Sequence, residues 1–229
     1  MSGMAIQLPL GIGLRDEASF DNFIAAGNES LVDALTHGLD KIVYVWGGVS
    51  VGKTHLLQAW CKRQAELGRS VSFLPLLQYQ ELSPDICEGL ESLDAVCIDD
   101  LQAVSGLPEW EEALFHLFNR IRDAGGLLLM AGETAPSGLG LGLADLESRL
   151  NGSLVLHTLG LDDQAKIDAL RLRASARGLE LSNEVGQFLL RHYPRDMAVL
   201  FALLDKLDHA SMAAQRRLTI PFIKQVMEQ

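Results

Sequence analysis

The residues with the clearest chemical potential form one continuous stretch of this chain: Gly47, Gly48, Val49, Ser50, Val51, Gly52, Lys53 and Thr54. The stretch matches the pattern G-x-x-x-x-G-K-[ST] at every fixed position. Glycines let the backbone turn tightly, so its N–H groups converge on one concavity that suits phosphate. Lys53 can reach the outer phosphates of a nucleotide, and the Thr54 hydroxyl can ligate Mg²⁺. The stretch therefore predicts a site for ATP or ADP with Mg²⁺, and another nucleoside diphosphate would also satisfy the loop.

A strand before this loop and a helix after it must position the site. Residues 42–46 form a short apolar run that is typical of a buried strand, and residues 55–67 have helical character. The N-terminus of that helix, where His55 lies, adds partial positive charge beneath the phosphates, so we include His55 in the nucleotide site. The alternative, a chance glycine turn that ends in Lys-Thr, does not explain this order of elements.

Two consecutive carboxylates follow another apolar run. Asp99 and Asp100 come directly after residues 95–98, which we expect to form a strand. In open parallel sheets, ligands bind at the carboxyl ends of the strands. We therefore expect Asp99 to hold Mg²⁺, directly or through water, and Asp100 to position the attacking water. The alternative is a solvated Asp-Asp turn, which the nearby phosphate loop disfavours.

The order of the remaining elements predicts an α/β fold with two folded domains. Apolar runs at 70–77, 127–131 and 154–157 predict further strands, and an amphipathic helix over 110–121 is ended by Gly125-Gly126. Strands that alternate with helices indicate a mostly parallel sheet covered on both faces. After residue 160 only helical periodicity remains. We expect a flexible tail over 1–17, an α/β nucleotide-binding domain over 18–160 and a small all-helical lid domain over 161–229.

The composition restricts the compartment and the partners. The net charge is -11, which disfavours strong direct binding of DNA through a general basic surface. Cys61, Cys87 and Cys97 fit neither a metal pattern nor a disulfide framework, so buried thiols in a reducing compartment are expected. We find no signal peptide and no stretch long enough to span a membrane. The expectation is a cytoplasmic protein without a membrane partner.

Several motifs together resemble the DnaA branch of the AAA+ ATPases. The run Gly-Lys-Thr-His-Leu-Leu-Gln-Ala at 52–59 and the run Cys-Ile-Asp-Asp-Leu-Gln at 97–102 carry the resemblance most clearly. It extends to Phe-Asp-Asn-Phe at 20–23 and to the stretches at 145–150, 195–197 and 218–222, and so covers about residues 18 to 229. The resemblance implies a P-loop AAA+ sheet domain followed by a helical lid.

The same resemblance implies roles for individual residues. Phe20 and Phe23 match the segment that contacts the nucleobase. Arg149 matches the arginine finger, which acts on a nucleotide held by a neighbouring subunit, and Arg195 matches the sensor-2 arginine of the lid. Plainer alternatives are a surface salt bridge of Arg149 with Glu147 or Asp145, and a solvated charge at Arg195. Position 132 falls at sensor 1, where glycine replaces the usual hydroxyl residue and Glu133 keeps the charge.

The N-terminal tail contains Gln7-Leu8-Pro9-Leu10, which resembles the linear motif by which replication proteins dock on the DNA polymerase III sliding clamp. Gln7 would fix the orientation, and Leu8 and Leu10 would fill an apolar pocket. On this resemblance, we expect the protein to lack the helix-turn-helix DNA-binding domain and the loader-interaction domain of DnaA. A DnaA-like core with a clamp motif resembles the Hda-type regulators.

That resemblance implies a negative regulator of replication initiation, which stimulates ATP hydrolysis by the initiator DnaA when bound to the sliding clamp. Its own nucleotide would be mainly structural and its own ATPase activity weak, and self-association as a homodimer or larger assembly is expected. The alternative is a self-sufficient ATPase or helicase loader of the DnaC type, which intact Lys53, Thr54, Asp99 and Asp100 would permit. A DNA-binding initiator fragment is disfavoured by the acidic charge.

Overall fold

The computed structural model describes residues 18–38, 40–214 and 218–227. At its centre is a five-stranded sheet in the order β2-β3-β4-β1-β5, in which every pairing is parallel. The predicted parallel sheet is thus confirmed. The strands are β1 (Ile42–Trp46), β2 (Val71–Pro75), β3 (Ala95–Asp99), β4 (Leu127–Gly132) and β5 (Leu154–His157).

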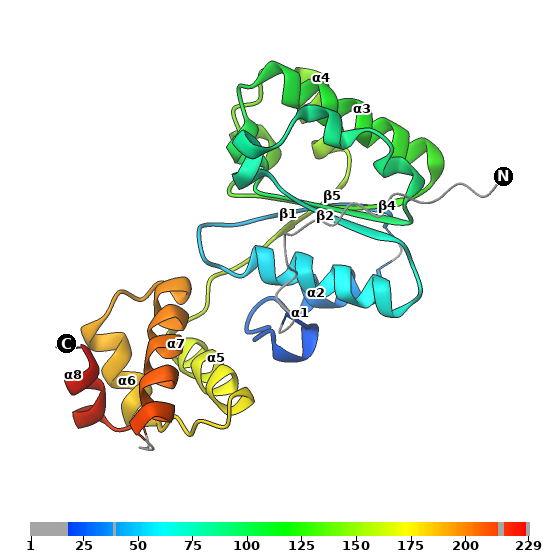
Figure 1. The fold of residues 1–229 in the computed structure, drawn as a ribbon. Coiled ribbons are helices and arrows are strands. Elements are labelled where there is room, and N and C mark those ends of the chain that lie inside the picture. The colour runs from blue at the N-terminus through cyan, green and yellow to red at the C-terminus, as the bar shows by residue number, and fades with distance from the viewer. Residues whose placement is uncertain (1–17, 39, 215–217, 228–229) are drawn as a thin grey trace.

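Helices cover both faces of this sheet (Figure 1). One face carries α1 (Glu29–His37) and α2 (Lys53–Glu66), and the other carries α3 (Pro108–Ala124) and α4 (Ala144–Asn151). Short 3-10 helices occur at η1 (Phe20–Asn22), η2 (Leu76–Glu81), η3 (Pro84–Cys87), η4 (Leu90–Ser92), η5 (Leu101–Val104) and η6 (Pro136–Gly138). The lid consists of α5 (Asp163–Ala176), α6 (Asn183–His192), α7 (Met197–Ala214) and α8 (Ile220–Met227).

The alternation of side chains along β1 shows why these apolar runs become buried strands. Val43 and Val45 lie on the face of the sheet that α2 covers, whereas Tyr44 between them lies on the face that α3 covers. Because consecutive side chains point to opposite faces, a sheet covered on both sides requires apolar residues at nearly every position. Pro75 ends β2, and it is tolerated because β2 is an edge strand.

Local details differ from the expectations where backbone geometry intervenes. The predicted strand over 70–77 ends at Pro75, and the chain turns into η2. Before β1, η1 and α1 are two separate elements, because Gly27 adopts a left-handed turn (φ +80°) between them. The helix expected from residue 55 begins at Lys53, directly after the left-handed Gly52.

The lid has a core of its own. Leu170, Leu189 and Leu200 are completely buried in it. Asp162 and Ser182 cap its first two helices by accepting hydrogen bonds from the N–H groups of residues 165 and 185. These caps explain why the helices begin where they do.

Contacts of Asn28 and Ile24 help to connect the lid to the nucleotide-binding domain. The Asn28 side chain donates to the Leu159 carbonyl (3.0 Å) and accepts from the Leu159 N–H (2.7 Å), which holds the segment between β5 and α5. Ile24 packs against the lid core. These contacts attach the lid beside the end of β1 that leads into the phosphate loop.

Two further expectations can be checked. Cys61, Cys87 and Cys97 are buried and form no disulfide with one another, as predicted. None of the helices in the described ranges is both long and apolar enough to cross a membrane.

Candidate nucleotide-binding site

The phosphate loop has the backbone conformation that its glycines make possible. Gly52 lies at φ +100°, a value that side chains other than glycine rarely permit, and the Phe23 ring fills the space where its Cβ would be. At Gly47 a Cβ would lie 2.5 Å from the Thr158 carbonyl oxygen. Ser50 at the loop crest also has a positive φ of 59°. The loop is therefore shaped by close contacts with the Phe23 ring at Gly52 and with the Thr158 backbone at Gly47.

Lys53 is held inside this loop. Its ammonium donates to the carbonyl oxygens of Gly47 (2.8 Å) and Gly48 (2.7 Å), and the residue is only 7% exposed. Burial lowers the pKa of Lys53, and the nearby charges of Asp100 and Asp99 partly offset this effect. A cation buried beside the loop is well placed for the phosphate role predicted from the motif.

Asp99 and Thr54 come together at the carboxyl end of β3. The Asp99 carboxyl is buried (1% exposed) and hydrogen-bonded to the Thr54 side chain. Burial, and secondarily the charge of Asp100, raise the pKa of Asp99 to about 6. A cation at this place would relieve the repulsion between the two carboxylates.

The same pair of residues fits Mg²⁺. Mg²⁺ prefers oxygen ligands and usually binds one or two protein groups, with phosphates and waters supplying the rest. The Thr54 hydroxyl and the Asp99 carboxylate are such a pair. Within the described ranges, no cluster of three or more His, Cys, Asp or Glu side chains forms a separate metal site. Thr54 and Asp99 are thus the residues that would hold Mg²⁺ beside the phosphates, where the ion would offset phosphate charge.

Gln102 is a site residue that the motif analysis did not assign. Its amide nitrogen donates to Asp100 (2.9 Å) and lies 3.5 Å from a Glu133 carboxylate oxygen. Its amide oxygen accepts from the Glu133 backbone N–H (3.2 Å). Gln102 thereby links the acid expected to position water with the residue at sensor 1. The sequence shows that Gln102 follows Asp99 by three residues. It does not show that Glu133, at the end of β4, is the partner of Gln102.

The predicted base-contacting segment lies against the phosphate loop. His55 on α2 makes a hydrogen bond with the Ser19 carbonyl (2.9 Å), and its ring lies 5.6 Å from that of Phe23. Phe20 lies in the adjoining η1 and packs against the core under α2. The structure therefore brings Phe20, Phe23 and His55 to the same end of the site.

The lid approaches the loop through Asp196 rather than through Arg195. Asp196 is hydrogen-bonded to the Ser50 side chain and also caps α7 by accepting from the N–H groups of Ala198 and Val199. These hydrogen bonds lower the pKa of Asp196. The Arg195 guanidinium instead pairs with Asp163 (3.2 Å), where both side chains are more than half exposed. Contact of Arg195 with phosphates remains a prediction.

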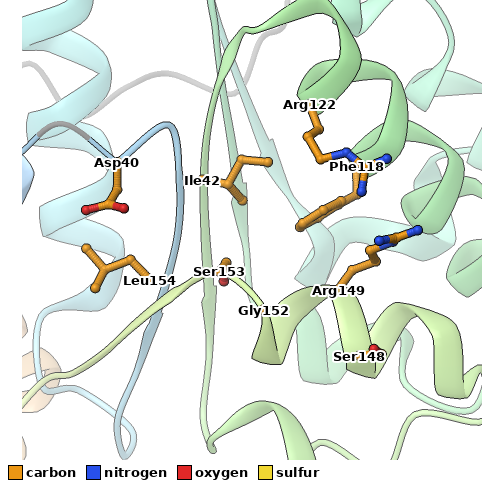
Figure 2. A pocket seen from close by; sticks show the side chains of 9 residues that line it. All are labelled: Asp40, Ile42, Phe118, Arg122, Ser148, Arg149, Gly152, Ser153 and Leu154. Atoms are coloured by element: carbon orange, nitrogen blue, oxygen red, sulfur yellow. The ribbon is translucent and has the colours of Figure 1, made fainter.

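Arg149 lies away from this site. It lines a hollow of about 270 Å³ together with Ile42 at the start of β1 and Leu154 at the start of β5 (Figure 2). The phosphate loop follows the other end of β1. Among the described residues the Arg149 guanidinium has no hydrogen-bond or ion-pair partner, so the alternative of a salt bridge with Glu147 or Asp145 is not realised.

Comparison with known families gives a specific match over nearly all of the chain. The family model of the bacterial DnaA ATPase domain matches residues 14–157. A second model, that of the Hda lid domain, matches residues 163–227. The chain belongs to the DnaA-related AAA+ family, of the Hda type. The family resemblance inferred from the motifs is confirmed, and with it the nucleotide-binding character of the α/β domain.

Solved structures of DnaA-related and other AAA+ proteins share the fold. Domain III of the Thermotoga maritima replication initiation protein DnaA is 21% identical with a TM-score of 0.80, and the match covers 94% of this chain and 98% of that one. AMPPCP-bound DnaA from Aquifex aeolicus is 23% identical with a TM-score of 0.68, over 84% and 65% of the two chains. The Thermotoga maritima RuvB branch migration motor is 21% identical with a TM-score of 0.65, over 94% and 72%. The α/β AAA+ fold with a helical lid is thus confirmed.

One part of the predicted site cannot be placed. The clamp motif of Gln7, Leu8 and Leu10 lies outside the described residues. Its function remains a prediction from the sequence.

Proposed function

We propose that this DnaA-related protein is a negative regulator of replication initiation, which presents Arg149 to ATP bound by the initiator DnaA and stimulates its hydrolysis. The observation that carries the proposal is the position of Arg149. Its guanidinium lines an open hollow at the opposite end of β1 from the phosphate loop, without an in-chain partner among the described residues.

Distance separates Arg149 from the chain's own nucleotide site. β1 runs from Ile42 to Trp46, and a five-residue strand extends about 15 Å. The hollow borders its first residue, whereas the phosphate loop follows its last. An arginine at this end is suited to a phosphate supplied by another subunit. An arginine supplied in trans is worth roughly 10³ or more in the rate of phosphoryl transfer.

In this proposal, the sliding clamp concentrates the regulator where DnaA must be inactivated. Gln7, Leu8 and Leu10 would dock on the clamp, and the α/β domain would engage DnaA. The nucleotide held by Lys53 would serve mainly to order the phosphate loop and the lid. A diphosphate suffices for this purpose, because the loop N–H groups need no γ-phosphate.

The test is ATP hydrolysis by DnaA, measured with and without this protein on clamp-loaded DNA. We expect stimulation by the parent protein and its loss in Arg149→Ala, with unchanged thermal stability and unchanged affinity for ADP. Arg149→Lys should restore little activity, because an ammonium lacks the planar fork. Arg191→Ala changes an exposed arginine that also lies in the last turn of its helix, and it should behave like the parent. Equal stimulation by parent and Arg149→Ala proteins would contradict the proposal.

A self-sufficient ATPase is the second candidate, and one observation favours it. Gln102 holds Asp100 in a hydrogen-bonded arrangement with Glu133, which is suited to positioning water beside a bound γ-phosphate. In that case, the protein should hydrolyse ATP without DnaA. Arg149→Ala should then lose this intrinsic ATPase activity. That outcome would replace the regulator with a motor or helicase loader of the DnaC type.

A further inference from the structure

A second guanidinium shares the hollow of Arg149. Arg122 lies in the last turn of α3, Arg149 lies in the last turn of α4, and both line the same cavity. Figure 2 shows the two side chains extending toward one another beside the Phe118 ring. We propose that Arg122 is a second phosphate-binding residue of this site, which together with Arg149 receives the polyphosphate of a nucleotide held by the partner ATPase. This inference rests on the proposed function of Arg149.

The fold holds both cations at one place. Each arginine lies at the C-terminal end of its helix, where the helix dipole is negative and favours a positive side chain. Phe118, which is buried, and Ile42 of β1 are apolar residues that line the same hollow. The two guanidinium groups therefore gather at the rim without a buried carboxylate to neutralise them.

The charged residues around the hollow leave Arg122 able to bind phosphate. Arg122 pairs with its neighbour Asp123 at 3.2 Å, and the two side chains are 42% and 71% exposed. Such a surface pair contributes little free energy, so phosphate oxygens can replace it. Asp40 is the one acidic residue among those lining the hollow, and Figure 2 shows it on the far side from the two arginines. The arginine side of the hollow is thus the side that attracts an anion.

The size of the hollow suits one part of a ligand, not a whole ligand. At about 270 Å³ it is smaller than the roughly 300–1,000 Å³ of pockets that enclose a whole ligand. A nucleotide that remains in the partner's phosphate loop would need to place only its outer phosphates here. Two guanidinium forks can bind such phosphates in a bidentate manner and from two directions.

The experiment uses the full chain in the DnaA hydrolysis assay on clamp-loaded DNA. Arg122→Gln should lower stimulation by roughly tenfold to a hundredfold, as expected for the loss of a charged hydrogen bond. Its melting temperature and its affinity for ADP should be unchanged. Arg122→Lys should recover only part of the stimulation, and the control Arg191→Gln should lose none.

The outcomes separate this inference from the proposed function. If Arg122→Gln stimulates as well as the parent while Arg149→Ala does not, Arg122 has no such role and the regulatory proposal stands. Full stimulation by Arg149→Ala would overturn both. If Arg122→Gln loses stability and Arg122→Lys restores both stability and full stimulation, a structural cation at the helix end suffices and the inference is wrong.

Discussion

The Tyr44 hydroxyl occupies the space that any side chain at Gly132 would need. A Cβ at position 132 would lie 2.1 Å from the Tyr44 oxygen. Tyr44 is completely buried, and its hydroxyl donates to the Thr134 carbonyl at 2.8 Å. Burial also raises the pKa of Tyr44, so the hydroxyl remains a donor. This packing explains why glycine occupies the sensor-1 position, where the DnaA branch usually has a hydroxyl residue.

Tyr44 and Gly132 should therefore be energetically coupled. Gly132→Ala should lower the free energy of unfolding by about 1–3 kcal/mol, because the added methyl overpacks a filled core. The cost should be smaller in a Tyr44→Phe background, which lacks the obstructing oxygen. Denaturant unfolding of the two single variants and the double variant measures this coupling. Gly48→Ala is the control, since a Cβ there meets nothing within 4 Å. An equal cost of Gly132→Ala in both backgrounds would refute the coupling.

Lys53→Ala should weaken the binding of ADP at least tenfold, because a charge-assisted contact with phosphate contributes about 1.5–3 kcal/mol. Isothermal titration calorimetry provides the measurement. Lys62→Ala removes an exposed lysine from the same helix and should leave the affinity unchanged. Equal affinities of Lys53→Ala and parent would show that the loop does not hold the phosphates.

Gln102→Ala should reduce the intrinsic, partner-independent rate of ATP hydrolysis by roughly tenfold, since Asp100 would lose the hydrogen bond that orients it. Single-turnover hydrolysis measures the rate, and the affinity for ADP should not change. Gln78→Ala is a control at an exposed glutamine outside the site. An unchanged rate in Gln102→Ala would mean that the bond to Asp100 has no part in hydrolysis.

Asp99 should make the protein less stable as the pH rises from about 4 to about 6. Its pKa is raised from the usual 3.8 to about 6 in the folded chain, so the folded state binds the proton more tightly than the unfolded state. The stabilising contribution is present below pH 4 and lost above pH 6. The difference corresponds to about 3 kcal/mol in the free energy of unfolding.

Asp99→Asn should remove this pH dependence and be more stable than the parent above pH 6. Denaturant unfolding in EDTA, at several pH values, tests the expectation without divalent cations. Asp145→Asn, at an exposed position, should keep the parental profile. A parental profile in Asp99→Asn would show that another group titrates.

Combined substitution of Gln7 and Leu8 by alanine should abolish retention on immobilised sliding clamp. A linear motif binds at about micromolar affinity, near -8 kcal/mol. The loss of two anchors that each contribute more than about 1 kcal/mol would weaken this binding at least tenfold. The melting temperature should not change, because we expect the tail to lie outside both folded cores. Unaltered retention of the double variant would count against regulation through the clamp.

Local patterns in the sequence were sufficient for the elements that build the phosphate site. The glycine loop, the apolar run before it and the Asp99-Asp100 pair each depend on neighbours in the chain, so their conformations follow from short-range geometry. Parallel strands also align their carboxyl ends at one edge of the sheet, which made the approach of Asp99 to the phosphate loop predictable.

Only the tertiary structure decided the relationships between residues that are distant in the chain. Gln102 meets Glu133 because β3 and β4 are adjacent strands, and the Tyr44 hydroxyl packs against Gly132 because β1 is the other neighbour of β4. Arg122 and Arg149 share a hollow because α3 and α4 cover the same face of the sheet. Strand order and helix packing fix such pairs, and periodicity within one segment carries no information about which segments will be neighbours.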